Sequence, residues 1–552
     1  MTPLDHVDDY PEIPISLGST RDSVKTGEWR SVRPVASERT APCSAGCPAG
    51  VPIPAYLHLI TAGLLGEAFE LFTAHNPFPR ITGRVCPHFC QEVCNLAART
   101  EDGPVSIRGI ERWLGDATAH LPHVTPHAAT GARVAVVGSG PGGLSAAYFL
   151  RRSGHEVTVY ERRHDLGGML RHAIPDYRLP SEVVDAEVAR LEAMGIEFRT
   201  GVALGVDVGL DDLEASHAAV FVATGASIER RLDIPGEHLL HGGLEFLDAV
   251  ARGDAVLPDR RCAVVGGGNT AMDVARVLRR LGAEVTVIYR RTAAEMPAIP
   301  EEYERALADG VRFEWLAVPR SIGEGGDGLV VEIEEMRLGE ADGSGRPRPE
   351  ATGRIRREAF DGVFAAIGET ADPAPFPQRL RDTAGWLVVG PEGATADPMV
   401  HAGGDLVTGP ATVVAAIAAG RAAARAIDRM LGFADRWPEE PSGTVVPPAE
   451  VNPVRRVRRA MAVDPASASP DRMAEETLTI AAAVALDEIE RCLSCGHCNE
   501  CGACFVFCPD GAIAWGPGPR IDLEYCKGCG ICVTECPGRA LVLVNERDLV
   551  HA

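Results

Sequence analysis

A cysteine-rich stretch near the end of the chain constrains its fold more than any other part of the sequence. It contains two runs of the spacing C-x2-C-x2-C-x3-C-P, one from Cys498 to Pro509 and one from Cys526 to Pro537. Thiolates at these spacings converge on a metal centre, because a tight loop brings three together and the fourth comes from farther away. Two copies predict two [4Fe–4S] clusters in one small domain.

The paired runs resemble those of two-cluster bacterial ferredoxins, in which the fourth cysteine of each run ligates the neighbouring cluster. The resemblance implies one cluster held by Cys498, Cys501, Cys504 and Cys536, and a second held by Cys526, Cys529, Cys532 and Cys508. A pair of zinc sites is the alternative, since C-x2-C pairs also bind zinc, but two complete runs favour iron–sulfur clusters. Such a domain has no use for the preceding pair, Cys492 and Cys495.

Five further cysteines lie near the N-terminus, namely Cys43, Cys47, Cys86, Cys90 and Cys94. The last three recur every four residues, which on a helix would place their sulfurs along one face. Before them, the apolar residues of 53–72 recur at helical spacing and predict one amphipathic helix. So many cysteines in a short span predict a metal site. A small zinc site that also uses His75 or His88 is the alternative.

Residues 133–161 predict a strand–turn–helix–strand unit that binds a dinucleotide. Gly138, Gly140 and Gly143 form G-x-G-x-x-G after a buried strand, and Glu161 ends the next strand. The glycines allow a tight turn, a close approach of the pyrophosphate to the backbone, and close packing of helix on strand. The helix N-terminus supplies free N–H groups for the phosphates, and Glu161 is placed to accept hydrogen bonds from the ribose.

A second unit of the same kind begins at residue 261. We expect the second nucleotide to contact its turn residues Gly266, Gly268, Asn269 and Thr270. Its second strand ends in Arg290 and Arg291 instead of an acid. Arginines there can pair with a 2′-phosphate, which favours NADPH and leaves NADH possible. The alternative is that both arginines cap a surface strand.

Tandem units predict FAD in the first and a nicotinamide nucleotide in the second. Later in the chain, Asp405 is placed to bond the ribitol chain of FAD. Thr412 precedes a helix of small residues whose N-terminus is placed to face the flavin ring or the pyrophosphate. Core packing is the alternative for that helix. Cys262, on a buried strand, is interpreted as a core residue.

The overall composition is that of a multidomain protein that keeps its cysteines reduced. The chain has 552 residues, 16 cysteines and a net charge of −23 at pH 7. The negative charge argues against nucleic acid as a partner. The sequence contains no secretory signal and no apolar run long enough for a membrane span, so we expect a cytoplasmic protein. In a reducing compartment, cysteines are metal ligands more often than disulfides.

Residues from about 40 to 430 resemble the small subunit of glutamate synthase. They are also similar to the flavin end of dihydropyrimidine dehydrogenase and to the large subunit of electron-bifurcating transhydrogenase. The resemblance rests on motifs in the family's order, among them Asn76–Pro79, Gly83–Pro87, Gly167–Leu170, Ile174–Pro180 and Ala366–Gly368. It implies FAD, a nicotinamide nucleotide and two N-terminal [4Fe–4S] clusters. It also places Gly168, Leu170 and Arg178 among the cofactor-binding residues.

The chain departs from this family at its N-terminus. The family's R-C-x2-C-G pattern is missing upstream of Cys43 and reappears as Arg491–Gly496, directly before the ferredoxin run. We therefore expect the C-terminal segment to fold back, so that one cluster is held by Cys43, Cys94, Cys492 and Cys495. The family's use of a glutamine or glutamate past the last cysteine implies that the other is held by Cys47, Cys86, Cys90 and Glu111. The alternative is that Glu111 is a surface residue and its cluster has a water ligand or three irons.

These patterns predict an α/β protein with two nested Rossmann-like domains, a helical iron–sulfur domain before them and an α+β ferredoxin domain after them. The predicted boundaries are an arm and helical [4Fe–4S] domain at 1–128, an FAD domain at 129–255 and 369–435, an NAD(P)H domain at 256–368, a linker with a short helix at 436–490, and a two-cluster ferredoxin domain at 491–552.

The predicted function is exchange of hydride between NAD(P)H and FAD, with single electrons passing through four [4Fe–4S] clusters in either direction. No domain for a carbon substrate is recognisable, so we expect a catalytic partner subunit in a multi-subunit oxidoreductase. Fused chains of this kind resemble the electron-input subunits of thiamine-diphosphate 2-oxoacid oxidoreductases. One alternative is a glutamate synthase (NADPH) small subunit that feeds an amidotransferase subunit. The other is a non-catalytic scaffold whose clusters only stabilise the fold.

Overall fold

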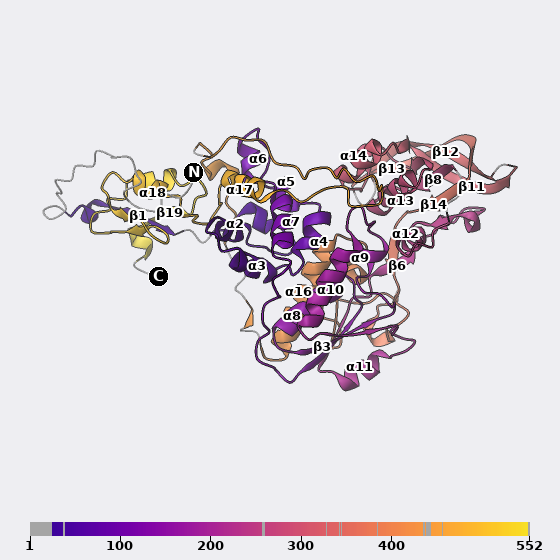
Figure 1. Cartoon of the computed structure of the whole chain (residues 1–552), viewed down its shortest axis with the longest axis horizontal. Coiled ribbons are helices and arrows are strands. Elements are labelled where there is room, and N and C mark those ends of the chain that lie inside the picture. The colour runs from indigo at the N-terminus through magenta and orange to yellow at the C-terminus, as the bar shows by residue number, and fades with distance from the viewer. Residues whose placement is uncertain are drawn as a thin grey trace.

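The computed structural model describes residues 25–36, 39–256, 260–326, 328–341, 343, 345–383, 385–433, 436–437, 443–454 and 456–549. Figure 1 shows an elongated molecule, with a small C-terminal lobe at one end and the second nucleotide unit at the other. A helical domain and the first nucleotide unit lie between them. In the described part of the chain, no helix is both long and apolar enough to cross a lipid bilayer.

The helical domain (residues 41–121) is built from short helices that surround the N-terminal cysteines. The helix predicted over 53–72 is in fact two helices, because the chain turns at Gly63, whose φ is +76°. The helices are α1 (Pro42–Ala45), α2 (Ile53–Thr61), α3 (Leu65–Thr73), α4 (Pro79–Val85), α5 (Phe89–Glu92), α6 (Asn95–Arg99) and α7 (Ile107–Ala117). Their apolar faces share one core with Ile489 and Leu493 from the far end of the chain.

The first nucleotide domain is a parallel sheet of five strands in the order β16-β5-β2-β3-β4. Its strands are rich in valine and alanine and are mostly buried, as in sheets with helices on both faces. They are β2 (Arg133–Val137), β3 (Glu156–Glu161), β4 (Glu197–Thr200), β5 (Ala219–Val222) and β16 (Val400–Ala402). The accompanying helices are α8 (Pro141–Arg152), α9 (Met169–His172), α10 (Ser181–Ala193), α11 (Leu210–Ser216), α15 (Asp405–Thr408) and α16 (Val413–Met430).

The second nucleotide domain repeats this plan with the strand order β10-β9-β8-β14-β7, again all parallel. Its strands are β7 (His241–Gly242), β8 (Arg261–Val265), β9 (Glu284–Tyr289), β10 (Arg312–Trp315) and β14 (Gly362–Ala365), with helices α12 (Gly243–Ala251), α13 (Asn269–Arg280) and α14 (Pro300–Ala308). An antiparallel meander of β11 (Ala317–Gly325), β12 (Gly328–Ala341) and β13 (Pro347–Phe360) extends from it. A two-stranded sheet of β6 (Ala226–Glu229) and β15 (Glu369–Ala371) links the two domains.

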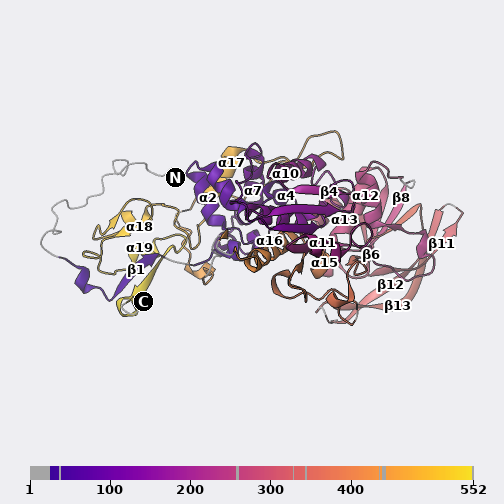
Figure 2. The ribbon, with the colours of Figure 1, turned by 90° about the horizontal axis from the view of Figure 1, so that it is seen from below.

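The C-terminal lobe (residues 25–36 and 497–549) is completed by the N-terminal segment. Strand β1 (Val32–Ala36) pairs antiparallel with β19 (Leu541–Asn545), and Figure 2 shows the two side by side at that end of the molecule. The lobe also contains α18 (Ala503–Val506), α19 (Ile531–Thr534), β17 (Ile513–Ala514) and β18 (Arg520–Ile521). The predicted N-terminal arm therefore contributes a strand here, and its residues 1–24 lie outside the described part of the chain.

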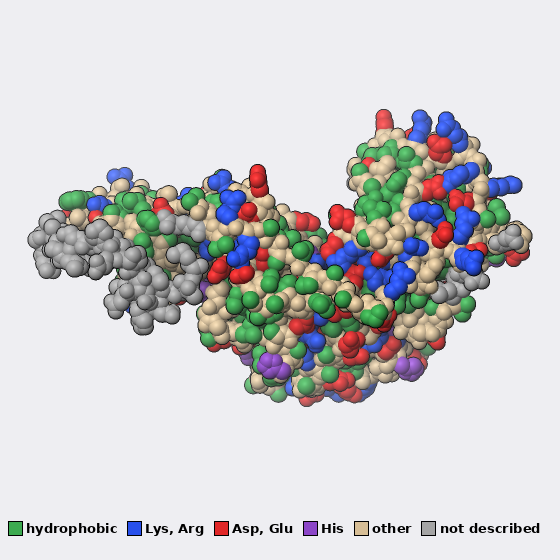
Figure 3. All heavy atoms as spheres, turned by 45° about the horizontal axis from the view of Figure 1, so that its top comes forward, with side chains coloured by type: hydrophobic (Ala, Val, Ile, Leu, Met, Phe, Trp, Pro, Cys, Tyr) green, Lys and Arg blue, Asp and Glu red, His purple; other side chains and the backbone are tan. Residues whose placement is uncertain are grey.

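The segment predicted as a linker is bound along the body of the molecule. This strap (residues 443–481) leads into α17 (Ala482–Arg491) and runs between the two ends of the molecule in Figure 1. Its Glu475 accepts hydrogen bonds from Arg84 and Arg112 of the helical domain, and its Glu476 pairs with Arg276 of the second nucleotide domain. Figure 3 shows side chains of both charge signs in the hollow between that domain and the central part.

Candidate cofactor sites

A cavity of about 460 Å³ lies at the carboxyl ends of the first sheet, where ligands bind in parallel α/β sheets. The predicted FAD residues that line it are Gly138, Gly140, Glu161, Gly168, Leu170, Arg178, Asp405 and Thr412. Gly143 does not line it. A Cβ on Gly143 would lie 1.9 Å from the carbonyl oxygen of Gly138, so this glycine serves the close helix–strand packing that the sequence predicts.

The glycine turn fits a dinucleotide phosphate. Gly138 has φ +101°, and a Cβ there would lie 2.4 Å from the carbonyl oxygen of Ala223, so only glycine suits the turn. A Cβ on Gly140 would meet no atom within 4 Å, which leaves the space beside the backbone open to a ligand. The N-terminus of α8 follows at once and presents its free N–H groups there.

Glu161 and Arg178 line the cavity but already have protein partners. Glu161 accepts hydrogen bonds from the backbone N–H and the hydroxyl of Ser139, at 2.9 and 2.7 Å. The guanidinium of Arg178 donates to Asp273 at 2.8 Å and lies 3.1 Å from Glu302, so it joins the two nucleotide domains. The structure thus gives Arg178 a domain-bridging contact that its motif did not predict.

Asp405 and Thr412 flank the opposite wall of the cavity. Burial raises the pKa of Asp405 to about 6, so this carboxyl is readily protonated and can donate as well as accept a hydrogen bond. The hydroxyl of Thr412 caps α16 by accepting from the N–H of Ala415. The cap orients the helix N-terminus toward the cavity, as the sequence predicts.

The same cavity is lined by residues that the sequence reasoning missed. Val85 and Pro87 reach it from the helical domain, on either side of Cys86. Glu369 of β15 also lines it and accepts a hydrogen bond from Thr270 at 3.2 Å. The motif Gly83–Pro87 contains Val85 and Pro87, and Ala366–Gly368 directly precedes Glu369, so motif position was the signal that could have found them.

The second glycine turn lies across the cavity from the first. Asn269 and Thr270 line the cavity, whereas Gly266 and Gly268 shape the turn behind them. A Cβ on Gly266 would lie 2.1 Å from the carbonyl oxygen of Ala366, and one on Gly268 would meet nothing within 4 Å. Because residues of both turns line one cavity, two nucleotides bound at them would have their ends close together, as hydride transfer requires.

Arg290 and Arg291 line a different cavity, of about 610 Å³, beyond the end of β9. Arg290 is exposed, but Arg291 is only 3% exposed, and its Nε donates to the carbonyl oxygen of Pro347 at 2.8 Å. The two predicted phosphate ligands are therefore not equivalent, because Arg291 also holds the meander against β9.

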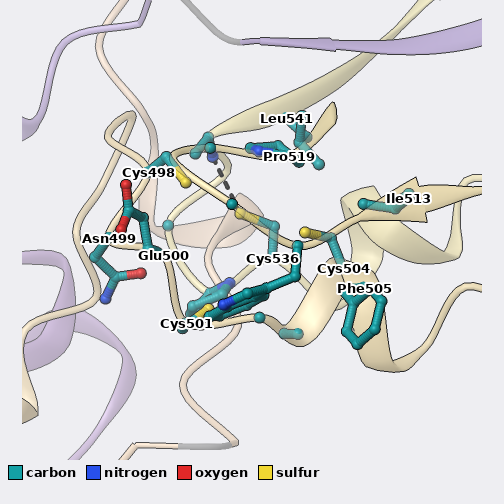
Figure 4. A pocket seen from close by; sticks show the side chains of 18 of the residues that line it. Cys498, Asn499, Glu500, Cys501, Cys504, Phe505, Ile513, Pro519, Cys536 and Leu541 are labelled. Carbon is teal, nitrogen blue, oxygen red and sulfur yellow. Dashed lines mark hydrogen bonds between the residues drawn. The ribbon is translucent and has the colours of Figure 1, made fainter. Parts of the chain in front are cut away.

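Three compact apolar cavities are each surrounded by four cysteines. Two are in the C-terminal lobe and join the residues that the ferredoxin resemblance groups, namely Cys498, Cys501, Cys504 and Cys536 around one, and Cys508, Cys526, Cys529 and Cys532 around the other. Figure 4 shows the sulfurs of the first set directed into the space between them. Among the described residues, no three His, Cys, Asp or Glu side chains converge as closely as a single metal ion would require.

The third cavity joins the two ends of the chain. It is lined by Cys43 and Cys94 of the helical domain together with Cys492 and Cys495, which follow α17. We call it the split cavity. Asn95 ties its halves together, since its side-chain amide reaches both the sulfur of Cys495, at 3.5 Å, and the carbonyl oxygen of Val446, at 2.9 Å.

The other three N-terminal cysteines gather around Glu111. Burial raises the pKa values of the Cys47, Cys86 and Cys90 thiols, and the charge of Glu111 adds to the rise for each, so its carboxylate lies close to all three. Burial raises the pKa of Glu111 itself to about 8, and Thr82 donates a hydrogen bond to it. Glu111 thus lies half-buried beside the cysteines.

The chain separates Cys86, Cys90 and Cys94 by breaking the helix on which the sequence placed them. Cys86 follows the end of α4, Pro87 prevents continuation, and His88 adopts a left-handed conformation with φ +64°. Cys94 then precedes α6 in an extended conformation. The prediction of three sulfurs on one helical face was therefore wrong. The break sends Cys94 to the split cavity and leaves the other two beside Glu111.

Burial makes the thiols poor acids in the absence of a metal. It raises the pKa values of Cys86, Cys495 and Cys504 to about 12 each. Ligation requires the thiolate, so metal must displace the proton in these cavities. Iron–sulfur assembly at such sites is expected to stabilise the folded chain, because the unfolded chain presents no preformed site.

Comparison with known proteins identifies the family. Residues 132–420, just over half of the chain, match the model of the pyridine nucleotide-disulphide oxidoreductases. The chain belongs to this oxidoreductase family. Residues 32–121 match dihydropyrimidine dehydrogenase domain II, 4Fe-4S cluster, and residues 519–542 match the 4Fe-4S binding domain. These matches confirm the fold class and the resemblance to FAD/NAD(P)H oxidoreductases with an N-terminal and a C-terminal 4Fe-4S region.

Curated relatives of this oxidoreductase include proteins from several bacteria. The chain is 38% identical over 426 residues to the NADP(+)-dependent formate dehydrogenase subunit beta of Moorella thermoacetica, covering 71% of this chain and 60% of that protein. It is 35% identical to the NADPH-Fe(3+) oxidoreductase subunit beta of Geobacter sulfurreducens, covering 71% and 64%. It is 34% identical to the glutamate synthase [NADPH] small chain of Escherichia coli, covering 70% and 87%. The chain thus spans less than two thirds of the length of the first two.

Proposed function

We propose that this chain is an NADP(H)-dependent flavoprotein subunit that holds FAD and four [4Fe–4S] clusters and exchanges electrons with a separate catalytic subunit. The observation that carries the proposal is the continuity of candidate sites from the flavin cavity to the C-terminal lobe. Val85 and Pro87 line the flavin cavity. Cys86, between them, belongs to the group of Cys47, Cys86, Cys90 and Glu111, which we call the Glu111 site. Bound FAD would accept a hydride and release its electrons singly, as one-electron iron–sulfur carriers require.

The next steps of the proposed route join neighbouring sites. Cys90 of the Glu111 site is close enough to Cys43 of the split cavity that the two charges influence each other. Cys495 of the split cavity is three residues before Cys498, which lines the first cavity of the C-terminal lobe. The last cavity contains Cys529, which is exposed. We assign this exposed end as the place where electrons pass to or from the partner.

Anaerobic titration with NADPH tests the nucleotide and flavin part of the proposal. We expect NADPH to bleach the flavin absorbance and reduce the iron–sulfur signals, with about 16 irons per chain. NADH is expected to act more weakly, because the exposed Arg290 beyond the end of β9 favours a 2′-phosphate. If neither nucleotide reduces the flavin, only the scaffold alternative remains.

The partner is proposed to be the catalytic subunit of a multi-subunit oxidoreductase, and a thiamine-diphosphate 2-oxoacid oxidoreductase is one candidate. The relatives named as beta subunits support a complex, and a formate dehydrogenase catalytic subunit is a second candidate on the same ground. Purification of the native complex, followed by NADP⁺ reduction assays with formate and with a 2-oxoacid plus coenzyme A, separates these candidates. A complex that reduces NADP⁺ with neither would rule out both.

The lysine distribution makes the docking end directly testable. Lys25 and Lys527 are the lysines of the sequence, and they lie in the C-terminal lobe, beside Glu524 and Asp510. An amine-reactive crosslinker should therefore join the partner through one of these residues or the N-terminal amine. Substitution of Lys527 by Arg keeps the charge and should remove that crosslink. A crosslink that survives replacement of both lysines by arginine must come from the N-terminal amine, and the absence of any crosslink in the unmodified complex would contradict docking at this lobe.

A glutamate synthase small subunit is the second candidate function, favoured by the 87% coverage of the Escherichia coli small chain. In that case the chain would bring electrons to an amidotransferase subunit. Co-purification of a glutamine-dependent large subunit, with NADPH-dependent glutamate formation, would establish it. The additional C-terminal lobe argues for a different partner, because it adds two cysteine-lined cavities beyond residues 40–430, the part of the sequence that resembles the glutamate synthase small subunit.

A further inference from the structure

We propose that Arg348, on strand β13 of the meander, is a specificity residue that binds the 2′-phosphate of NADP(H) together with Arg290. This inference rests on the proposed use of NADP(H) and names a residue that no motif of the nucleotide unit contains. Arg348 lines the 610 Å³ cavity with Arg290 and Arg291, although it lies far from them in the sequence.

The position of the cavity matches the ribose end of a nucleotide. In a dinucleotide unit, the residue after the second strand contacts the 2′ position of the ribose. That strand is β9, which ends at Tyr289, directly before Arg290. The Tyr289 ring lies against the glycine turn, where a Cβ on Gly267 would be 2.5 Å from the ring. A nucleotide with its phosphates on this turn therefore has its adenosine end near Arg290.

Arg291 explains how a residue of the meander reaches this place. Its side chain is buried, and its Nε donates to the carbonyl oxygen of Pro347 at 2.8 Å. This bond anchors the beginning of β13 (Pro347–Phe360) beside the end of β9. Arg348 is the next residue and is exposed, as is Arg290. Arg291 is thus a positioning residue, while the two exposed arginines can approach an anion.

The charge balance of the cavity favours a bound anion. Three arginines face two carboxylates, Glu340 and Glu350. One of these carboxylates is already paired, because Glu350 lies 2.8 Å from Arg337. A phosphate group carries up to two negative charges and is bound best by arginines on more than one side. Arg290 follows β9 and Arg348 belongs to β13, so the two can bind a phosphate from different sides.

Calorimetric titration of the purified full-length protein with 2′,5′-ADP and with 5′-AMP tests the proposal. Arg348→Met should weaken 2′,5′-ADP binding roughly 10- to 100-fold, the usual effect of losing a charged hydrogen-bond partner. Binding of 5′-AMP should change less than twofold. Arg354→Met is the matched control, because Arg354 is an exposed arginine on the same strand that pairs with Glu335 and does not line the cavity.

The outcomes separate this inference from the proposed function. Equal binding of 2′,5′-ADP and 5′-AMP by the unmodified protein would overturn the NADP(H) preference and the role of Arg348 together. Discrimination by the unmodified protein that persists in Arg348→Met, as in Arg354→Met, would overturn the role of Arg348 alone. If Arg348→Met weakened the binding of 2′,5′-ADP and of 5′-AMP equally, the role of Arg348 would also be overturned, because the loss would then come from a disturbed structure.

Discussion

The split cavity and each of the two cavities of the C-terminal lobe are lined by four cysteines, but they differ in where those cysteines lie in the sequence and in how exposed they are. The lobe draws its ligands from two short runs, and each of its cavities has an exposed cysteine, Cys501 or Cys529. The split cavity draws them from the two ends of the chain, and its Cys43 and Cys495 are each 9% exposed. The lobe sites depend mainly on local loops, whereas the split site requires that the whole chain be folded.

The contacts around α17 show what holds the split site together. Arg491 is fully buried, forms an ion pair with Glu488, and donates to backbone carbonyl oxygens of residues 102–104 in the helical domain. A Cβ on Gly496 would lie 2.2 Å from the carbonyl oxygen of Arg39, so the tail passes directly against the head. A site of this kind couples cluster binding to the docking of distant segments.

The largest expected effect comes from removing one ligand of the split site. Cys492→Ala should release about four irons per chain, because a cubane needs four ligands. It should also block electron passage from the flavin to the C-terminal lobe while leaving the two lobe signals intact. Iron analysis and electron paramagnetic resonance measure both effects. Cys262→Ala, at a buried cysteine outside these cavities, is the control, and retention of full iron by Cys492→Ala would contradict the split site.

A smaller effect is expected when the ligands stay and only the docking contact is removed. Arg491→Met leaves the buried Glu488 with two backbone N–H donors but without its charge partner, which should cost up to about 3–5 kcal/mol. We expect lower thermal stability and selective loss of iron from the split site. Arg459→Met, which removes an exposed pair with Asp487 on the same helix, should have little effect. Equal behaviour of the two variants would mean that docking does not depend on Arg491.

The lobe can be perturbed through the strand that it takes from the N-terminus. Gly528 has φ +72°, and a Cβ there would lie 2.1 Å from the carbonyl oxygen of Val32 in β1. Gly528→Ala should therefore displace β1, cost about 1–3 kcal/mol, and speed iron loss to a chelator from the adjacent lobe site alone. Gly511→Ala has a positive φ but no neighbour within 4 Å, so it controls for backbone strain. Faster iron loss from the split site would show that the two regions are coupled.

The smallest expected effect is a dependence of the free energy of unfolding on pH, which arises from His123 in the central part of the molecule. Burial and the nearby Arg190 lower the pKa of His123 to about 3, against about 6.5 in the unfolded chain. The unfolded chain thus gains a proton first as pH falls, and stability decreases by about 1.4 kcal/mol per pH unit from about 6.5 toward 3.

His123→Phe keeps an aromatic ring beside Phe69 and Tyr148 and removes this titration. Between pH 6.5 and pH 5, the free energy of unfolding of the variant should fall by about 2 kcal/mol less than that of the unmodified protein. Thermal unfolding at several pH values measures the gain. His120→Phe, at an exposed position, is the control. A parallel pH profile in all three proteins would remove His123 as the cause.

Local patterns predicted the sites whose residues are close in sequence. The glycine turns at 138–143 and 266–271 lie where the sequence placed them, because a turn between a buried strand and a helix is determined by its own residues. The ferredoxin resemblance of the two cysteine runs implied the same grouping of the lobe cysteines that the two cavities show. The prediction that Cys86, Cys90 and Cys94 lie on one helical face was wrong, because Pro87 and His88 interrupt the helix and residue spacing alone does not show such a break.

By itself, the sequence determined which residues can bind nucleotides and clusters, because glycine turns and cysteine spacings are local geometry. Only the tertiary structure decided which other distant segments meet, as in the pairing of β1 with β19, the ion pairs that hold the strap to Arg84 and Arg276, and the placement of Arg348 near Arg290. These contacts depend on packing and ion pairs between residues far apart in the chain, whose closeness no local pattern records.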